Sequence, residues 1–215
     1  MTPAPRPPRA ALGPTVVAFA RQSLAGLRLL LALTVLLGLV YPAVVTGLAQ
    51  LAFPWQANGS LVSAHGERIT AAADAVGSAL VGQDLSGPGW FHPRPSVAGP
   101  GYDTLASGGS NLGPLDPALA ATVARRRAAV AAEEDVPPAD VPADAVTASA
   151  SGLDPHISPA YARLQVPRVA RVRGLPEAAV AALVSRHTQG RDLGVLGEPR
   201  VNVLELDLAL ATMVR

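Results

Sequence analysis

A single long apolar run dominates the pattern of hydrophobic and polar positions in this chain of 215 residues. Residues 29–53 contain no charged side chain, and Arg28 directly precedes them. As a helix, a run of this length extends about 37 Å, enough to cross a hydrocarbon core of ~30 Å with some tilt. The pattern therefore predicts one transmembrane helix over residues 29–53.

A cleaved signal peptide is the rival interpretation of this run. Gly47-Leu48-Ala49 offers a small-x-small sequence of the kind that signal peptidases cleave. The apolar region of a secretory signal is, however, only about 7–15 residues long. We therefore favour a retained anchor.

Polar and apolar positions alternate with turn residues along the rest of the chain. The Pro- and Ala-rich residues 1–14 predict disorder. Residues 60–62 and 76–81 flank a polar stretch and predict a hairpin. Residues 86–114 are dense in Gly, Pro and Ser and predict a long ordered loop, and residues 133–142 an exposed acidic one.

Three helices are predicted from their capping residues. Asp116 followed by Pro117 begins a helix that should run to about Ala132. Ser158 begins a second helix that ends at Gly174 and is kinked or split by Pro167. The third begins at Leu175-Pro176-Glu177 and stops near Gly190.

The C-terminal segment alternates leucine with other residues. Leu204, Leu206, Leu208 and Leu210 have a period of two, which predicts a strand. The fold class expected is a single N-terminal transmembrane helix plus one mixed α+β soluble domain, residues 54–215.

The charge distribution predicts the orientation in the membrane. Residues 1–28 hold four Arg and no acidic residue, so this end should be cytoplasmic and the soluble domain extracytoplasmic. Trp55, just past the apolar run, suits the headgroup region. The residues after the run carry 13 Arg against 16 acidic side chains, which argues against a nucleic-acid partner.

The composition excludes several kinds of chemistry. The chain has no Cys, which removes disulfides, zinc–thiolate sites and a cysteine nucleophile. All 17 basic residues are Arg, so a P-loop lysine is also missing.

Small and polar residues recur along the apolar run. Thr34, Gly38, Pro42 and Thr46 are four residues apart and share one broad stripe. Small residues let another helix approach closely, so we expect a helix-packing face, although Gly and Pro are common in membrane helices. The centre of the run has no ionisable group, so ion conduction by this chain alone is not expected.

The first polar motif of the soluble domain is Gly-rich. It comprises Ser107, Gly108, Gly109, Ser110, Asn111 and the following Leu-Gly-Pro. Glycines allow backbone amides to approach an anion, but without the lysine a phosphate cradle is poorly supported. A tight, hydrogen-bonded loop is the preferred interpretation.

The second motif, residues 147–159, contains Ser151, Asp154 and His156. These residue types could serve a hydrolase, but there is no G-x-S-x-G elbow. One His and one Asp are too few for a metal site. Helix capping and turn formation are the preferred roles. Asn58-Gly59-Ser60 fits a glycosylation sequon, a short match that is often accidental.

At these same residues the chain resembles the C subunits of Kdp-type potassium-transporting ATPases, across roughly residues 25–210. The longest matching segments are Phe53–Leu61, Gly77–Gln83, Ser107–Pro114, Thr147–Pro159 and Leu196–Leu204. Asp116 and Asp207 stand where the family often has Asn, and residues 71–75 resemble an insertion.

The resemblance implies a non-catalytic accessory subunit in the cell membrane. Its partners would be a channel-like potassium-binding subunit, a P-type ATPase subunit and a small membrane peptide. The family role is described either as a chaperone that raises the ATPase subunit's affinity for ATP, shared between the two chains, or as an outer-side stabiliser.

The predicted topology favours the outer-side role, because ATP is cytoplasmic. Two other functions stay open. One is a stand-alone anchored binding protein, and the other is an anchored serine hydrolase using Ser151 or Ser110 with His156 and Asp154.

Overall fold

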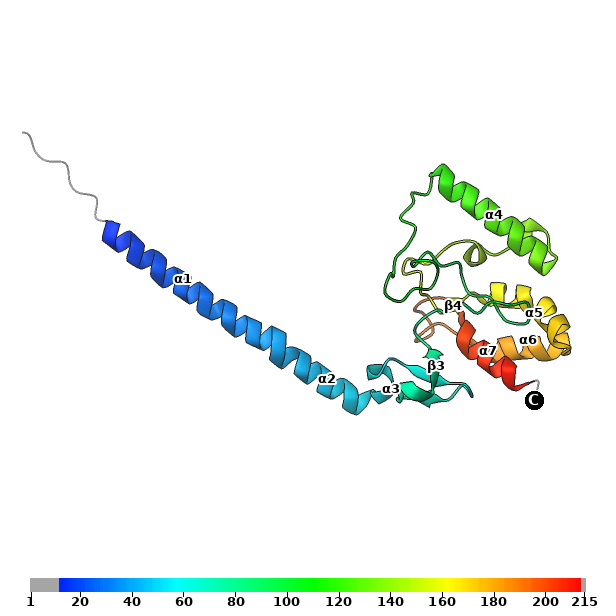
Figure 1. Cartoon of the computed structure of the whole chain (residues 1–215), viewed down its shortest axis with the longest axis horizontal. Coiled ribbons are helices and arrows are strands. Elements are labelled where there is room, and N and C mark those ends of the chain that lie inside the picture. Colours follow the sequence, from blue (N-terminus) through cyan, green and yellow to red (C-terminus); the bar gives the residue numbers. More distant parts are fainter. Residues whose placement is uncertain (1–11, 214–215) are drawn as a thin grey trace, which may run out of the picture. The chain divides into compact units, whose positions relative to one another are not determined.

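The computed structural model describes residues 12–213 of the chain. Their contacts divide into two units, one ending at Ala57 and the other beginning at Asn58. The first unit is a long helix and the second a mixed domain of helices and short antiparallel sheets (Figure 1). The predicted fold class is therefore confirmed.

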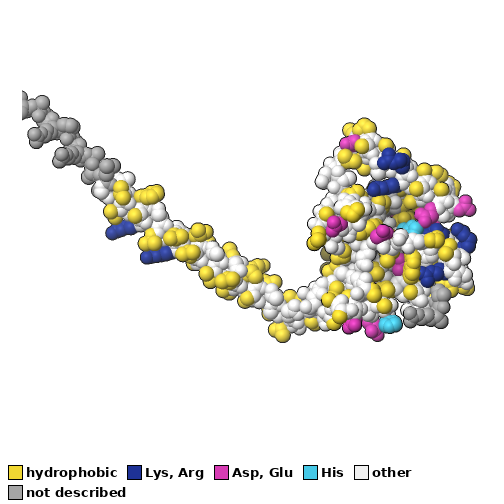
Figure 2. All heavy atoms as spheres, in the orientation of Figure 1, with side chains coloured by type: hydrophobic (Ala, Val, Ile, Leu, Met, Phe, Trp, Pro, Cys, Tyr) yellow, Lys and Arg dark blue, Asp and Glu magenta, His cyan; other side chains and the backbone are white. Residues whose placement is uncertain are grey.

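The N-terminal unit is helical from Leu12 to Ala57, apart from a break at Phe53. It comprises α1 (Leu12–Val35), a π-helical turn η1 (Leu36–Val40), α2 (Tyr41–Ala52) and the short α3 (Pro54–Ala57). Over Thr15–Ala52 it is long and apolar enough to cross a membrane. Hydrophobic side chains cover its visible face, and arginines lie toward its N-terminal end (Figure 2).

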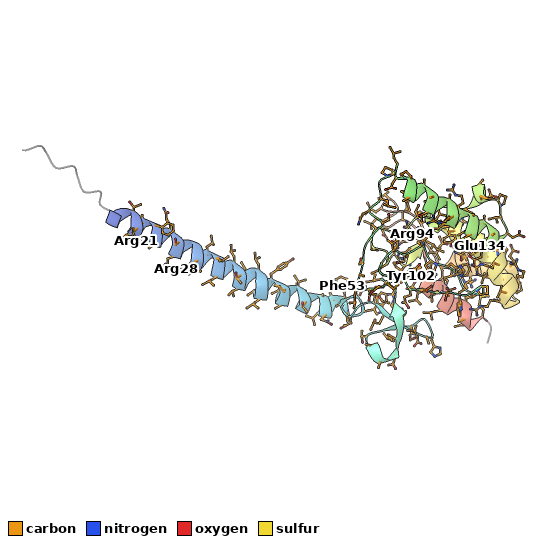
Figure 3. All side chains as sticks on the ribbon, turned by 45° about the horizontal axis from the view of Figure 1, so that its top comes forward. Arg21, Arg28, Phe53, Arg94, Tyr102 and Glu134 are labelled. Carbon is orange, nitrogen blue, oxygen red and sulfur yellow. The ribbon has the colours of Figure 1, made fainter. Side chains whose placement is uncertain are left out.

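This helix is longer than the predicted span of residues 29–53. It begins at Leu12, so the expectation of disorder over residues 1–14 is wrong for 12–14, and residues 1–11 lie outside the described part. Arg21 and Arg28 are exposed on α1, whereas Phe53 marks the opposite end (Figure 3). Helical geometry therefore does not itself fix where the membrane begins.

The first sheet follows the helical unit directly. Its order is β2-β1-β3, with β1 (Leu61–Ser63) pairing antiparallel to both β2 (Arg68–Ile69) and β3 (Ala75–Ser78). The expected antiparallel pairing of these segments is present between β1 and β3, but they do not form a simple hairpin, and the strand ends at Ser78 rather than residue 81. The polar stretch between them adds β2, and a 3₁₀ turn η2 (Ala72–Asp74) leads into β3.

The second sheet brings distant segments together. Its order is β4-β6-β5, all antiparallel, with β4 (His156–Ile157), β6 (Arg200–Asn202) and β5 (Thr188–Gln189). The register places His156 opposite Asn202 and Thr188 opposite Val201. This sheet therefore joins the 147–159 and 196–204 segments.

The predicted helix caps are confirmed. Asp116 accepts a hydrogen bond from the Ala118 N–H and begins α4 (Pro117–Glu134). The Ser158 hydroxyl likewise caps α5 (Pro159–Arg173), which ends at Gly174 with φ of 65°. Pro167 does not split α5.

The third predicted helix is α6 (Glu177–Arg186), shorter than expected because β5 follows it. Two 3₁₀ turns, η3 (Pro138–Asp140) and η4 (Ala143–Ala145), interrupt the segment after α4. No helix or strand lies within residues 86–114, as predicted.

The predicted C-terminal strand is wrong. Residues 203–212 form a helix, α7 (Val203–Thr212). Val203, Leu206, Asp207 and Leu210 lie on its buried face at the i, i+3, i+4, i+7 spacing of a helix. Together with α5, α6 and β6, α7 builds the core, whose fully buried side chains include Phe91, Ile157, Val169, Val180, Val184, Val201, Leu206 and Leu210.

Candidate functional site

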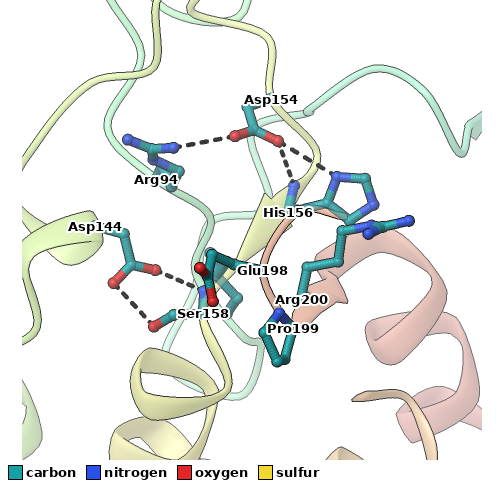
Figure 4. Close-up of a pocket in the computed structure, with 10 residues that line it drawn as sticks. Arg94, Asp144, Asp154, His156, Ser158, Glu198, Pro199 and Arg200 are labelled. Carbon is teal, nitrogen blue, oxygen red and sulfur yellow. Dashed lines mark hydrogen bonds and ion pairs between the residues drawn. The ribbon is translucent and has the colours of Figure 1, made fainter. Parts of the chain in front are cut away.

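Asp154 lies on the wall of a pocket in the soluble domain and joins several of the residues around it. The pocket has a volume of about 370 Å³. Arg94 donates from Nη1 to Asp154 Oδ2 at 3.1 Å, and the His156 N–H donates to Asp154 Oδ1 at 3.0 Å. The His156 ring Nδ1 lies 3.4 Å from the same oxygen (Figure 4). One carboxylate therefore links an arginine from the 86–114 loop to strand β4.

These contacts determine the ionisation state of the Asp154 carboxyl group. Burial alone would raise the pKa of Asp154. The hydrogen bonds from His156 and the positive charge of Arg94 outweigh burial, so the pKa lies below its ordinary value. The carboxylate is therefore ionised at neutral pH, and it supports folding until acid protonates it.

A second carboxylate on the pocket wall fixes the start of α5. Asp144 accepts from the Ser158 N–H at 2.6 Å and from its hydroxyl at 2.9 Å (Figure 4). The Ser158 Oγ in turn accepts from the Tyr161 N–H. This serine is therefore a cap, as predicted.

Hydrogen bonds join the 107–111 motif to the 149–152 segment. The Ser151 carbonyl accepts from the Gly108 N–H at 2.9 Å and from the Ser107 hydroxyl at 3.0 Å. Gly152, with φ of 67°, lies so close to the Gly108 carbonyl that a Cβ there would be 2.8 Å from its oxygen. The two motifs thus form one hydrogen-bonded loop pair that requires glycine.

The other members of the first motif are Gly109, Ser110 and Asn111. Ser110 and Asn111 are exposed, and Asn111 has a left-handed φ of 53°. Asn tolerates the left-handed region better than most residues, which explains Asn at this position. Gly109 packs against the Ala150 backbone.

Asn58, Gly59 and Ser60 form the turn into β1. Gly59 and Ser60 both have positive φ, 87° and 52°. The Ser78 hydroxyl donates to the Gly59 carbonyl, and the Ala79 N–H donates to the Ser60 carbonyl. Ser60 is fully buried, and its hydroxyl has no hydrogen-bond partner among the described residues. This motif therefore shapes the entry into the domain.

The serines, His156 and Asp154 do not assemble a hydrolase triad. The Ser158 hydroxyl donates to Asp144, and the Ser151 hydroxyl contacts Ser149 at 3.5 Å. Across residues 12–213, no hydrogen bond joins a serine to the His156 ring. The pair that is present, Asp154 and His156, lacks a positioned nucleophile.

A buried polar cluster was not predicted from the sequence. Arg168, 3% exposed, donates from Nε to Glu134 at 2.9 Å and from Nη2 to the Gln165 amide oxygen at 2.8 Å. Its Nη1 donates to the Pro88 and Trp90 carbonyls. Burial raises the pKa of Glu134, although the Arg168 charge and hydrogen bond pull it down. The cluster ties α4 and α5 to the 86–114 loop.

The π-helical turn η1 realigns the small-residue stripe. In a continuous α-helix, Thr46 would lie about 120° around the axis from Thr34. Five π-helical residues, at about 4.4 per turn, remove roughly 90° of that drift. Thr34, Gly38, Pro42 and Thr46 then share a narrower face. Within residues 12–213, a Cβ on Gly38 would meet no atom within 4 Å apart from the backbone of its own helix.

No cluster of three or more potential ligands that could hold a metal ion occurs in the described part of the chain. In the pocket, the Asp154 carboxylate already contacts both the His156 ring and the Arg94 guanidinium.

Comparison with known proteins decides the family. The family model described as K+-transporting ATPase, c chain, matches residues 23–212. The chain belongs to the KdpC family. A potassium-transporting ATPase KdpC subunit from Kineococcus radiotolerans is 56% identical over 190 residues, which cover 88% of this chain and 93% of the relative.

Two further KdpC subunits show similar likeness. That of Gemmatimonas aurantiaca is 56% identical and covers 85% of this chain and 88% of its own length. The subunit of Geobacter sulfurreducens is 51% identical, and the match covers 86% of this chain and 95% of that subunit. The family match includes most of the long helix and nearly the whole soluble domain, so the chain is a KdpC subunit of the Kdp potassium-transporting ATPase complex.

Proposed function

We propose that this chain is a non-catalytic accessory subunit of an ATP-driven potassium uptake complex, needed for its assembly and activity. Membership of the KdpC family carries the proposal. The proposed partners are the channel-like potassium-binding subunit, the P-type ATPase subunit and a small membrane peptide. ATP hydrolysis and potassium binding would reside in those chains.

We further propose that the protein crosses the cell membrane once, with its soluble domain outside. The apolar helix and the arginines that precede residue 29 support this orientation. In this topology the soluble domain does not reach cytoplasmic ATP. A chaperone role in ATP binding, which the family resemblance implies, would require the opposite orientation or contact through residues 1–28.

Cysteine labelling tests the orientation. This cysteine-free chain allows single cysteines at Thr15, on α1, and at Ala64, an exposed position after β1. An impermeant thiol reagent added to intact cells should label Ala64→Cys and not Thr15→Cys, because only the first position lies outside. Labelling of Thr15→Cys alone would reverse the topology and reopen direct contact with ATP.

Substitution on the membrane helix tests assembly. Gly38→Leu places a large side chain on the small-residue stripe and should separate packed helices, reducing recovery of the intact complex severalfold. Gly47→Leu is the matched control, since it lies about 100° around the axis from Thr46. Recovery is measured by copurification in mild detergent, together with potassium-stimulated ATPase rate per mole of complex.

The same experiment separates the alternative function. A stand-alone binding protein would purify without the other Kdp subunits even as wild type. Equal recovery for Gly38→Leu and Gly47→Leu would instead show that residue 38 faces lipid.

A further inference from the structure

The helix α1 continues on the N-terminal side of the charge-free run. Residues 29–53 already suffice to cross the hydrocarbon core, so the helical residues 12–28 extend about 25 Å further. Arg21 and Arg28 are exposed on this extension. An unpaired arginine is costly inside the hydrocarbon core, and this cost places Arg28 at the edge of the core rather than within it.

The two arginines lie on one side of the extension. They are seven residues apart in the sequence, so they differ by only about 20° around the axis and by roughly 10 Å along it. The small side chain of Ala25 lies between them, and the basic side chains of this helix gather on one side of it (Figure 2). Val16 and Phe19 occupy the opposite side. The positive charge of the extension is therefore confined to one face.

The helical unit provides no counter-ion for these two guanidinium groups. The first acidic residue of the chain is Glu67, in the soluble domain. In the proposed crossing, the whole charge-free run of about 37 Å separates Arg28 from that domain. An anion that neutralises Arg21 and Arg28 therefore comes from outside the chain.

We propose that the face of α1 that carries Arg21 and Arg28 binds the phosphate groups of anionic phospholipids, in the cytoplasmic leaflet under the proposed orientation. The inference rests on the proposed crossing of the membrane, and it does not depend on the partner subunits. Guanidinium groups donate two parallel hydrogen bonds to phosphate oxygens. Arg28 lies at the level of the phosphates, and Arg21, two turns further out, reaches them by extending along the helix.

The position and the charge of this face favour lipid over a second copy of the chain. Phosphate groups surround any helix at the edge of the hydrocarbon core, and anionic lipids attract basic residues next to a transmembrane segment. A second copy packed in parallel through the same face would bring arginine against arginine, and like charges repel.

Exchanging two residues separates a specific face from general positive charge. The variant that combines Arg21→Ser with Ser23→Arg keeps the composition and net charge of the chain. It moves one positive charge about 160° around the axis, away from Arg28. The variant that combines Arg21→Gln with Arg28→Gln removes both charges. Arg163→Gln, at an exposed position on α5, is the control for arginines of the soluble domain.

Lipid binding is measured on the isolated full chain in detergent by native mass spectrometry. The probes are phosphatidylglycerol, neutral phosphatidylcholine and inorganic phosphate. Wild type should bind phosphatidylglycerol on the order of tenfold more tightly than phosphatidylcholine. The double Gln variant should lose this preference, and the exchanged variant should lose about fivefold of it. Arg163→Gln should behave as wild type.

Three results would overturn the inference. Equal lipid preference in the exchanged variant and in wild type would mean that net charge alone attracts the lipid. Displacement of phosphatidylglycerol by millimolar inorganic phosphate would indicate a site for free phosphate. If wild type shows no preference while the double Gln variant fails to copurify with the other Kdp subunits, the arginines contact an acidic partner protein.

The lipid measurement is independent of the proposed subunit role. It uses this chain alone, so failure of wild type to copurify with other Kdp subunits would remove the proposed function and leave the lipid result standing. Conversely, loss of lipid preference in wild type overturns the inference while subunit membership stays intact.

Discussion

Replacing Arg168 by Met should destabilise the soluble domain by roughly 3–5 kcal/mol, because removing one partner of a buried ion pair leaves the other charge uncompensated. Glu134 would lose the donor to its Oε1, and its Oε2 already has no partner among the described residues. The Pro88 and Trp90 carbonyls would lose their donor as well. The expected readout is a large fall in the melting temperature of the full chain in detergent.

A double variant tests whether the unpaired charge causes the loss. Arg168→Met combined with Glu134→Leu removes both charges and should recover much of the stability lost in Arg168→Met alone. Arg163→Ala, at an exposed position on the same helix, is the control and should change little. A double variant as unstable as the single one would assign the loss to the carbonyl acceptors rather than to Glu134.

The elements that could be predicted from sequence are those set by local chemistry. Asp116, Ser158 and Gly174 mark helix ends because capping depends on residues within one turn. The apolar run was equally clear, because about 20 consecutive apolar residues are typical of a transmembrane helix. The 107–111 and 147–159 motifs were predicted as tight loops, and the structure adds that they hydrogen-bond to each other.

The sequence predicts a strand in place of the C-terminal helix because its leucines occur at every second position. Leu204, Leu206, Leu208 and Leu210 alternate, but a helix buried over a wide face also tolerates apolar residues at those positions. A signal for the helix was present, since Asn202 followed three residues later by Glu205 resembles a capping box. In the structure the Asn202 side chain does accept from the Glu205 N–H.

The buried cluster and the pocket depend on contacts distant in sequence. Arg168 and Glu134 are 34 positions apart, and Arg94 and Asp154 are 60 apart. Local patterns cannot show which of 17 arginines is buried, because charged side chains are ordinarily exposed. The packing of the 86–114 loop against α4 and α5 determines that Arg168 is the one that becomes buried.

Asp207 should give the second large effect. Its contribution to the stability of the fold should change with pH in the opposite direction to that of an ordinary carboxylate. It is 2% exposed on α7, and its Oδ1 accepts from the Phe91 N–H at 2.9 Å. Its Oδ2 has no hydrogen-bond partner among the described residues. Burial raises the pKa of Asp207 to about 8, against the Phe91 hydrogen bond and the charges of Arg173 and Arg168.

The direction of the pH effect follows from this raised pKa. The folded state holds the proton more tightly than the unfolded chain, whose aspartates titrate near 4. The contribution of Asp207 to stability is therefore fully present below about pH 4 and is lost as pH rises toward 8. Because Asn is neutral at every pH and can still accept from the Phe91 N–H, Asp207→Asn should remove this loss.

We expect Asp207→Asn to raise the melting temperature at pH 8 by several degrees, which corresponds to a gain on the order of 2 kcal/mol in the free energy of unfolding. The difference should be smaller at pH 5. The measurement is thermal unfolding of the full chain in detergent from pH 5 to 9. Asp140→Asn, at an exposed position, is the matched control and should follow wild type throughout. Parallel curves for Asp207→Asn and wild type would mean that Asp207 is already ionised in the folded protein. In that case Arg168 and Arg173 would have to stabilise the buried carboxylate more strongly than its burial opposes it.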